Sequence, residues 1–196
     1  DVVIADIDND GDLDLVCANQ NGDKITWEEN DGGADPSWTQ HTVVTGNTNI
    51  NGPCDLVVID LDQDGDKDIV AAAYAYGSSN QGIYWFENDG ADNPSWSQSQ
   101  IFSTGTIRDI GVGDVDSDGD LDVIAKSGRD TSRYMNWFEN DGSTDPSWSR
   151  NIVYSSKYAN YGSSFYLVDL DSDGDLDIAT GGWTSWYENN GASDPS

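Results

Sequence analysis

Four copies of a nine-residue acidic segment carry the residues best suited to chemistry in this chain. Each copy places Asp at positions 1, 3, 5, 7 and 9 and Gly at position 6, and the copies span residues 6–14, 60–68, 114–122 and 169–177. Alternate carboxylates around a sharp glycine turn form a cage of oxygen atoms, and calcium prefers oxygen ligands. The pattern therefore predicts four calcium ions, one in each acidic loop.

The predicted ligands are the five Asp residues of each acidic loop. They are Asp6, Asp8, Asp10, Asp12 and Asp14, then Asp60, Asp62, Asp64, Asp66 and Asp68, then Asp114, Asp116, Asp118, Asp120 and Asp122, then Asp169, Asp171, Asp173, Asp175 and Asp177. We expect positions 1, 3, 5 and 9 to bind through side chains. Position 7 should bind through its backbone carbonyl, with its carboxylate facing solvent. Magnesium keeps more of its waters and zinc needs Cys or His, so calcium fits the loops best.

The overall composition is strongly acidic. Acidic residues number 37 against 8 basic ones, for a net charge of -29. This charge argues against nucleic acid and anionic membranes as partners, and no apolar stretch approaches the roughly 20 residues of a membrane helix. Eight Trp, nine Tyr and apolar strand patterns indicate a folded core. The two cysteines, Cys17 and Cys54, leave both a disulfide and free thiols open.

A second repeated phrase follows each acidic loop. It reads Trp-Phe-Glu-Asn-Asp-Gly in two of its four copies, and it begins at Trp27, Trp85, Trp137 and Trp186. Its Asn/Asp-Gly and Asp-Pro-Ser motifs are typical of turns. The acidic loops start 54, 54 and 55 residues apart. We therefore expect one domain over residues 1–196, with repeats of about 1–54, 55–108, 109–163 and 164–196, the last one incomplete.

The repeat is predicted to consist of four short strands. In the second copy they cover 55–60, 68–74, 83–87 and 95–102. The first two are apolar on both faces, as in strands covered on both sides, and the last alternates as an outer strand does. This predicts an all-β fold, a β-propeller or propeller segment of four four-stranded antiparallel blades. Each blade carries its acidic loop between the first two strands, which excludes an EF-hand between helices.

The acidic loop, the apolar strand after it and the Trp-Phe-Glu-Asn-Asp-Gly phrase together resemble the FG-GAP/VCBS-type repeat of integrin-like calcium-binding propellers, in its bacterial secreted form. The Phe-Gly and Gly-Ala-Pro words of the integrin version are absent. The resemblance implies an extracellular or cell-surface module. Family propellers commonly have seven blades, so we expect a portion of a larger ring. An edge completed by another chain and a closed four-bladed ring are the alternatives.

Function is expected where the repeats differ, in the loops between second and third strands and between blades. Strand direction places both loop sets opposite the acidic loops. The candidate ligand-binding residues are Tyr74, Tyr76, Arg129, Arg133, Tyr134, Tyr158, Tyr161 and Trp183. Aromatic rings with polar and basic neighbours suit a protein or glycan ligand. We also expect self-association through the incomplete fourth blade.

No residue pattern indicates an enzyme. The single histidine, His41, lies in a predicted outer strand, and no nucleophile motif completes a triad. The glutamates of the second phrase, Glu28, Glu87, Glu139 and Glu188, recur and are interpreted as structural. The favoured function is a non-catalytic, calcium-binding extracellular module for adhesion or ligand recognition. The alternatives are a structural module of a surface fibre or filament and an ancillary domain of a secreted carbohydrate-active enzyme.

Overall fold

The computed structural model describes residues 1–46, 49–75, 80–103, 106–129, 132–156, 164–181 and 185–191. For Arg129, Ser132, Arg133, Ser155, Ser156 and Ser185 it describes the backbone alone. The chain divides into two compact units, residues 1–108 and 109–196, which are described separately. The unit boundary coincides with the boundary between the second and third sequence repeats.

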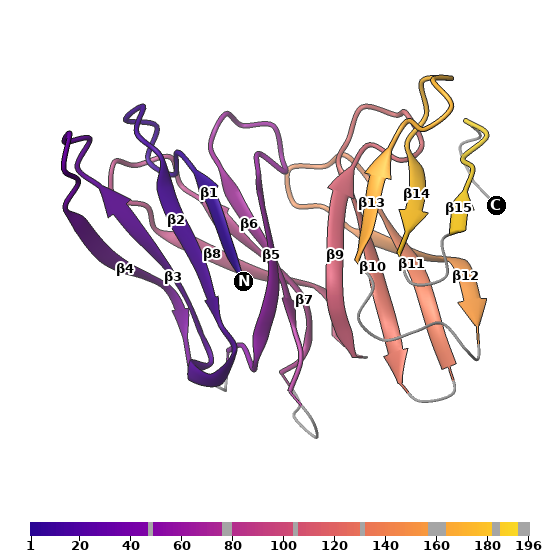
Figure 1. The fold of residues 1–196 in the computed structure, drawn as a ribbon, viewed down its shortest axis with the longest axis horizontal. Helices are drawn as coiled ribbons and strands as arrows, with labels where there is room; N and C mark the ends of the chain where they lie inside the picture. The colour runs from indigo at the N-terminus through magenta and orange to yellow at the C-terminus, as the bar shows by residue number, and fades with distance from the viewer. Residues whose placement is uncertain are drawn as a thin grey trace. The chain divides into compact units, whose positions relative to one another are not determined.

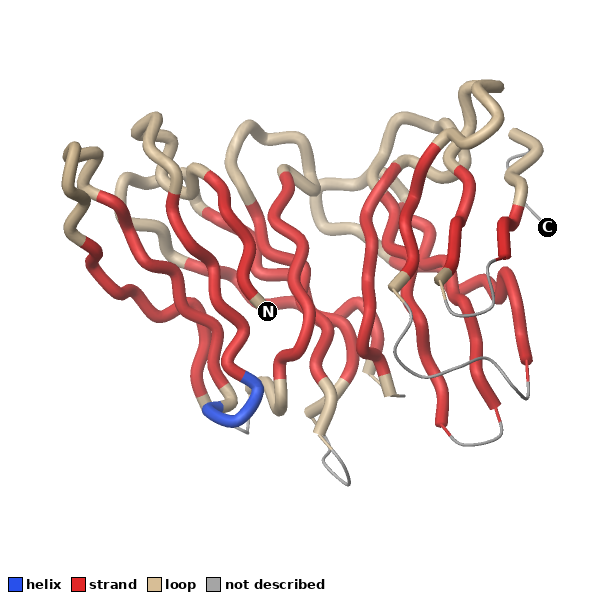
Figure 2. The backbone as a smooth tube through the Cα atoms, viewed as in Figure 1, coloured by secondary structure: helices blue, strands red, loops and turns tan. Residues whose placement is uncertain are grey.

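The first unit contains two four-stranded antiparallel sheets (Figure 1). The first sheet has the order β1 (Val2–Ala5), β2 (Asp14–Asn19), β3 (Lys24–Asn30) and β4 (Trp38–Thr45). The second has the order β5 (Pro53–Ile59), β6 (Asp68–Ala73), β7 (Gly82–Asn88) and β8 (Trp96–Phe102). A single turn of 3-10 helix, η1 (Gln20–Gly22), lies between β2 and β3 (Figure 2).

The second unit repeats this arrangement. Its four-stranded sheet consists of β9 (Ile107–Gly113), which begins just before the unit boundary, β10 (Asp122–Arg129), β11 (Ser132–Asn140) and β12 (Trp148–Ser156). The last sheet shows three strands among the described residues, β13 (Phe165–Val168), β14 (Asp177–Thr180) and β15 (Ser185–Tyr187). Sequence order equals spatial order in every sheet, so neighbouring strands are joined by short hairpins.

Burial along the strands follows the apolar pattern of the sequence. Every residue of β6 is buried, and β8 is mostly exposed. A strand covered on both faces must be apolar on both, whereas an outer strand needs apolar residues on one face. The predicted strands of the second repeat, and the acidic loop between the first two of them, are therefore confirmed.

Each unit has one apolar core between its two sheets. In the first unit, Val16, Ile25 and Trp27 of the first sheet pack with Ile69 and Phe86 of the second. In the second unit, a corresponding cluster consists of Val115, Ile124, Met135, Trp137, Phe165 and Ile178. Successive sheets thus pack face to face within each unit.

The prediction of an all-β fold is confirmed. The described residues form four antiparallel sheets, three of them with the four strands that were predicted and one with three. Both cysteines are free thiols, so the disulfide left open by the sequence is not formed. Among the described residues, no helix is long and apolar enough to cross a membrane.

Candidate metal centre

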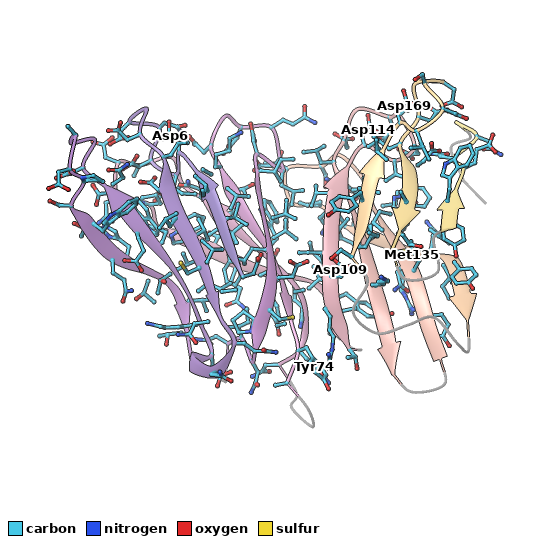
Figure 3. All side chains as sticks on the ribbon, viewed as in Figure 1. Asp6, Tyr74, Asp109, Asp114, Met135 and Asp169 are labelled. Carbon is cyan, nitrogen blue, oxygen red and sulfur yellow. The ribbon has the colours of Figure 1, made fainter. Side chains whose placement is uncertain are left out.

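Each acidic loop leaves the first strand of its sheet and enters the second. In the first loop, Asn9 at position 4 has φ 61° and Gly11 at position 6 has φ 96°. The other three loops repeat this pair with Gln63 and Gly65, Ser117 and Gly119, and Ser172 and Gly174. A Cβ atom at position 6 would meet no neighbouring atom, so lack of space does not explain the glycine. Its positive φ does, because residues with a side chain rarely adopt that conformation. In Figure 3 the loops marked by Asp6, Asp114 and Asp169 lie at the ends of their sheets.

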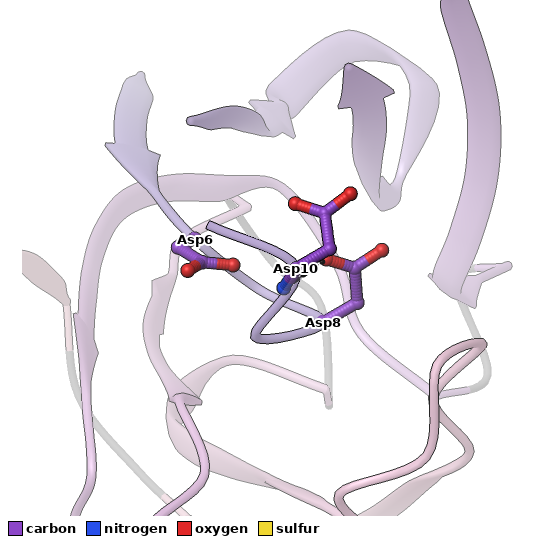
Figure 4. A group of neighbouring side chains, drawn as sticks. All are labelled: Asp6, Asp8 and Asp10. Atoms are coloured by element: carbon purple, nitrogen blue, oxygen red, sulfur yellow. Dashed lines mark hydrogen bonds between the residues drawn. The ribbon is translucent and has the colours of Figure 1, made fainter. Parts of the chain in front are cut away.

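Three carboxylates gather in each loop, with oxygen atoms within 4.8 Å of one another. The clusters are Asp6, Asp8 and Asp10 (Figure 4); Asp60, Asp62 and Asp64; Asp114, Asp116 and Asp122; and Asp169, Asp171 and Asp177. Positions 1 and 3 belong to all four clusters. Position 5 joins them in the first two loops, and position 9 joins them in the last two.

Buried oxygen atoms in these clusters show that the donor set fits a cation. Oδ1 of Asp6, of Asp60 and of Asp116 is buried and accepts no hydrogen bond. A buried polar atom without a partner is costly, and a cation would supply the partner. The other oxygen of Asp6, Oδ2, accepts the backbone N–H of Gly11 at 3.1 Å. The loop thus fixes the carboxylate through one oxygen and leaves the other for an ion.

Position 5 is oriented by the loop backbone. Oδ1 of Asp10 accepts the N–H of Asp12 at 2.8 Å, and Oδ1 of Asp64 accepts the N–H of Asp66 at 3.0 Å. These bonds form between residues two apart in the chain. The arrangement of the cluster is therefore local, and an all-oxygen set of this kind suits calcium.

Position 9 has a structural role that the spacing did not reveal. Asp68 is fully buried, and its Oδ2 accepts the N–H of Leu61 at 3.1 Å while its Oδ1 accepts the N–H of Asn88 at 2.9 Å. Asp14, Asp122 and Asp177 make the same pair of bonds. Each therefore joins the acidic loop to the end of the third strand.

Burial of position 9 changes its acidity. It raises the pKa of Asp68 to about 7 and the pKa of Asp122 to about 6, although both carboxylates accept backbone N–H groups that oppose the change. Burial also raises the pKa of Asp14. The pKa of Asp177 is lowered instead, because its burial is outweighed by the N–H groups of Asn189 and Leu170, which favour the ionised form. A bound cation would favour the ionised form of these groups.

Position 7 lies outside the carboxylate clusters of the described residues, as expected of a residue that would bind through its carbonyl. Its carboxylate packs against the glycine of the Asn/Asp-Gly turn instead of facing open solvent. A Cβ atom on Gly90, whose φ is 68°, would lie 2.0 Å from Oδ2 of Asp66. Gly32, Gly142 and Gly191 make the same approach to Asp12, Asp120 and Asp175.

An asparagine that the sequence assigned to a turn connects the acidic loops. The side-chain amide of Asn88 donates to the carbonyl of Lys67 in its own loop and to that of Ile7 in the preceding loop, both at 3.1 Å. Asn189 bonds Leu176 and Val115 in the same way. The available signal was the recurrence of this Asn in all four copies of the second phrase.

The candidate ligand-binding residues are described only in part. The guanidinium of Arg108 lies 4.3 Å from the ring centroid of Tyr74, and Tyr134 is half-buried in β11. Arg129 and Arg133 lie on paired strands, but their side chains fall outside the described part. Tyr76, Tyr158, Tyr161 and Trp183 also lie outside the described residues.

A polar cavity in the first unit was not predicted. Its volume is about 280 Å³, and its lining residues are Asn49, Asn80, Tyr84, Gln98, Ser99 and Gln100. Gln98 donates to the backbone carbonyl of Asn49 at 3.0 Å, which holds the outer strand against a connecting loop. Asn49 and Asn80 lie in the variable loops, whereas Gln98, Ser99 and Gln100 lie on the outer strand β8, and their convergence was not predicted.

Strand register corrects the alignment of one glutamate. Glu28 pairs with Leu15, and Phe86 pairs with Ile69 at the same place in the second sheet. Glu29, not Glu28, is therefore the counterpart of Glu87. His41 stacks on Trp27 with ring centroids 4.4 Å apart, and its Nε2 lies 2.7 Å from Oε2 of Glu29.

Comparison with known proteins identifies one family. The family model of the FG-GAP-like repeat matches residues 6–71 and 60–125, which together cover more than half of the chain. Each match begins at the first Asp of an acidic loop and ends in the strand that follows the next loop. No curated protein matches the chain.

Proposed function

Because the chain belongs to the family of FG-GAP-like repeats, we propose that its four sheets are successive blades of an integrin-like β-propeller or propeller segment. The face-to-face packing of the sheets in each unit supports this arrangement. The acidic loop between the first two strands of each sheet also supports it.

The proposed role of the acidic loops is to hold one calcium ion each as a structural fastener. The observation that carries this proposal is the buried, unpartnered Oδ1 of Asp6, of Asp60 and of Asp116. Positions 1 and 3 would contribute carboxylate oxygens in every loop, together with position 5 in the first two loops and position 9 in the last two. Position 7 would contribute a backbone carbonyl. Position 9 joins the loop to the third strand. When bound, calcium would supply charge neutralisation among carboxylates that otherwise repel one another.

Chelation tests this proposal. Binding to the folded state alone stabilises a protein by about 2.7 kcal/mol for each site at a free concentration of 100 times Kd. We therefore expect the melting temperature to fall steeply in excess EGTA and to return with added calcium. Elemental analysis of protein equilibrated with saturating calcium, after subtraction of the calcium in the dialysate, should find four bound calcium ions per chain. An unchanged melt in EGTA would contradict the proposal.

The proposed activity is recognition of a protein or glycan ligand outside the cell, without catalysis. The polar cavity supports a glycan, because the amide side chains of Asn49, Asn80, Gln98 and Gln100 can pair with sugar hydroxyls. Extracellular modules bind calcium with dissociation constants of roughly 10⁻⁴ to 10⁻³ M. Such weak binding fits acidic loops that are partly exposed to solvent.

A glycan array with matched variants tests the recognition site. Gln98→Ala removes one wall of the cavity, and Gln40→Ala changes the equivalent position of the first sheet, since Gln40 pairs with Glu28 as Gln98 pairs with Phe86. Binding that is lost in the first variant and kept in the second supports the cavity. Loss in Trp183→Ala instead would place the ligand on the variable loops.

A second candidate function is a structural module that assembles through a strand edge. An outer strand presents backbone N–H and C=O groups that can pair with another strand, and β15 is the outermost described strand of the last sheet. Trp186→Pro removes a backbone N–H from β15. Assembly that survives this change would count against edge pairing.

A further inference from the structure

The polar cavity of the first unit brings several carboxamide side chains together. Gln98 and Gln100 lie two residues apart on β8, so their side chains leave the same face of the strand, and both residues are exposed. Asn49 and Asn80 join them from the connecting segments. Each carboxamide has two N–H donors and a carbonyl acceptor. The cavity therefore presents donors and acceptors side by side.

The backbone on either side of Asn49 is held by Asp23, in the turn before β3. The carbonyl of Asp23 accepts the N–H of Gly46 at 2.9 Å, and its Oδ1 accepts the N–H of Gly52 at 2.9 Å. Ile50, next to Asn49, is fully buried. This wall of the cavity is therefore formed before a ligand arrives, which reduces the ordering that binding requires.

Among the described residues, no side chain that lines the cavity carries a charge. The lining consists of four amides, a serine and a tyrosine. Burial raises the pKa of Tyr84, so its phenol stays protonated. An anionic group in the cavity would lose hydration and would find no cation among these side chains. The net charge of -29 adds a general repulsion of anions.

We propose that the cavity binds an uncharged sugar ring and discriminates against acidic sugars, an inference that rests on the glycan recognition proposed above. A hydroxyl group both donates and accepts hydrogen bonds, as a carboxamide does, so neighbouring ring hydroxyls match the amides of the lining. The cavity volume of about 280 Å³ lies just below the roughly 300–1,000 Å³ of sites that enclose drug-sized ligands, which fits one ring.

The third sheet contains the residue that would reverse this preference. Arg150 on β12 pairs with Phe138 at the place where Gln98 pairs with Phe86. Its guanidinium donates to Oδ1 of Asn136, at 3.0 Å from Nε and 2.7 Å from Nη2. An outer strand of this fold therefore accepts arginine at this place. In the second sheet, arginine would supply the cation that the cavity lacks, and guanidinium groups bind carboxylates well.

A glycan array of matched pairs, read in saturating calcium, tests the proposal. Each pair presents a neutral hexose, with or without a 2-acetamido group, beside the uronic acid of the same ring configuration. For any pair that binds, we expect the neutral sugar to bind at least about tenfold more tightly than the acid, because only the acid leaves an uncompensated charge in the cavity.

Gln98→Arg is the main variant and Gln40→Arg its matched control. Gln40 holds the same place in the first sheet, where it pairs with Glu28. We expect Gln98→Arg to reverse the preference in favour of the uronic acid and Gln40→Arg to leave it unchanged. Asp23→Ala should weaken binding of the neutral sugar without reversing the preference, because it loosens the wall and adds no charge. Circular dichroism shows whether each variant folds.

The possible results separate this preference from glycan recognition itself. A uronic acid that binds as tightly as its neutral partner, with both lost in Gln98→Ala, would overturn the preference and leave recognition at the cavity standing. Glycan binding that neither Gln98→Ala nor Gln98→Arg changes would overturn the cavity as the site. An array on which no sugar binds would contradict the proposed glycan recognition and the preference together.

Discussion

Within one acidic loop, the five aspartates divide into residues that present charge and residues that hold the loop. Asp6, Asp8 and Asp10 bring their oxygens together, and one oxygen of Asp6 is buried without a partner. Both carboxylate oxygens of Asp14 accept backbone N–H groups, and the carboxylate of Asp12 lies against Gly32. Substitutions at these positions should therefore have different consequences.

Asp6→Asn and Asp12→Asn form a matched pair in the first loop. Asp6→Asn removes a ligand charge and should weaken calcium binding at that loop by about tenfold or more, equal to ~1.4 kcal/mol. Asp12→Asn keeps the backbone carbonyl that position 7 would contribute and should leave the affinity nearly unchanged. Isothermal titration calorimetry with calcium measures both. Equal losses would show that the carboxylate of Asp12 is a ligand.

The buried carboxylates at position 9 predict an inverted pH dependence for the calcium-free protein. The pKa of Asp68 is about 7 and that of Asp122 about 6 in the folded chain, against 3.8 for an ordinary Asp. A raised pKa means that ionisation destabilises the folded state. This cost is fully present above pH 7 and is lost as the pH falls toward 3.8. The free energy of unfolding should therefore rise between pH 8 and pH 5.

Urea unfolding of the calcium-free protein at several pH values measures this trend. Saturating calcium is the control, because protons then compete with the ion and stability should fall toward low pH. Asp31 and Asp89 have lowered pKa values, owing to backbone N–H groups of their turns. The stability that these two carboxylates contribute is lost only when the pH falls below the ordinary pKa of Asp, 3.8, and is therefore constant between pH 8 and pH 5. Calcium-free stability that falls from pH 8 to pH 5 would contradict the assignment.

The geometry of the candidate site could be predicted from the sequence where it is local. The clustering of positions 1 and 3 follows from alternate spacing around Gly11, within a few residues of chain. The bonds of Asp68 to Leu61 and Asn88 were not foreseen, because they join the loop to a strand 20 residues away. The polar cavity was missed because its residues come from separate strands and loops.

At the scale of strands and sheets, the asparagine of the second phrase links successive loops. Asn88 is buried and bonds carbonyls in two loops, whereas Asn30 is half-buried and donates to Leu13 in its own loop. Each buried partner left unpaired costs about 1–3 kcal/mol. Asn88→Ala should therefore destabilise the chain clearly more than Asn30→Ala.

Urea unfolding in saturating calcium compares these two variants. Calcium keeps both acidic loops filled, so the difference reports the link between loops. Both variants also lose the bond to the glycine of their turn, Gly90 or Gly32, so that loss cancels in the comparison. Equal destabilisation would mean that the bond to Ile7 contributes nothing.

The positions of the strands were also predictable from the sequence. Whether each face of a sheet is buried or exposed was not. The pattern of β6 and β8 follows directly from their residue types. Val2 and Leu56 are both apolar residues at the same place in a first strand, yet one is exposed and the other buried. Their difference depends on whether a neighbouring sheet is present. Register likewise decided that Glu28 stands at the position of Phe86.

For the whole molecule, the net charge of -29 is the dominant electrostatic property. Repulsion between exposed charges is screened over about 10 Å at 0.1 M salt and about 3 Å at 1 M. Added sodium chloride should therefore raise the melting temperature of the calcium-free chain by a few degrees. The calcium-bound chain should respond less, because each bound ion cancels two of the five negative charges of its loop. Thermal melts at matched pH measure the effect of salt on the calcium-free and the calcium-bound chain. An equal rise in melting temperature for the two would show that the repulsion comes from charges outside the loops.

The thiol of Cys54 can report local opening of the fold around β5. Burial raises the pKa of Cys54 to about 12, so at pH 8 only about one thiol in ten thousand is the reactive thiolate. Its Sγ lies 3.6 Å from the carbonyl of Ala72, beside a fully buried strand. Cys54 is half-buried and its pKa is raised, so alkylation should be slow in the folded chain and faster when β5 separates from its neighbours. The rate at which a maleimide labels Cys54 would therefore report that opening.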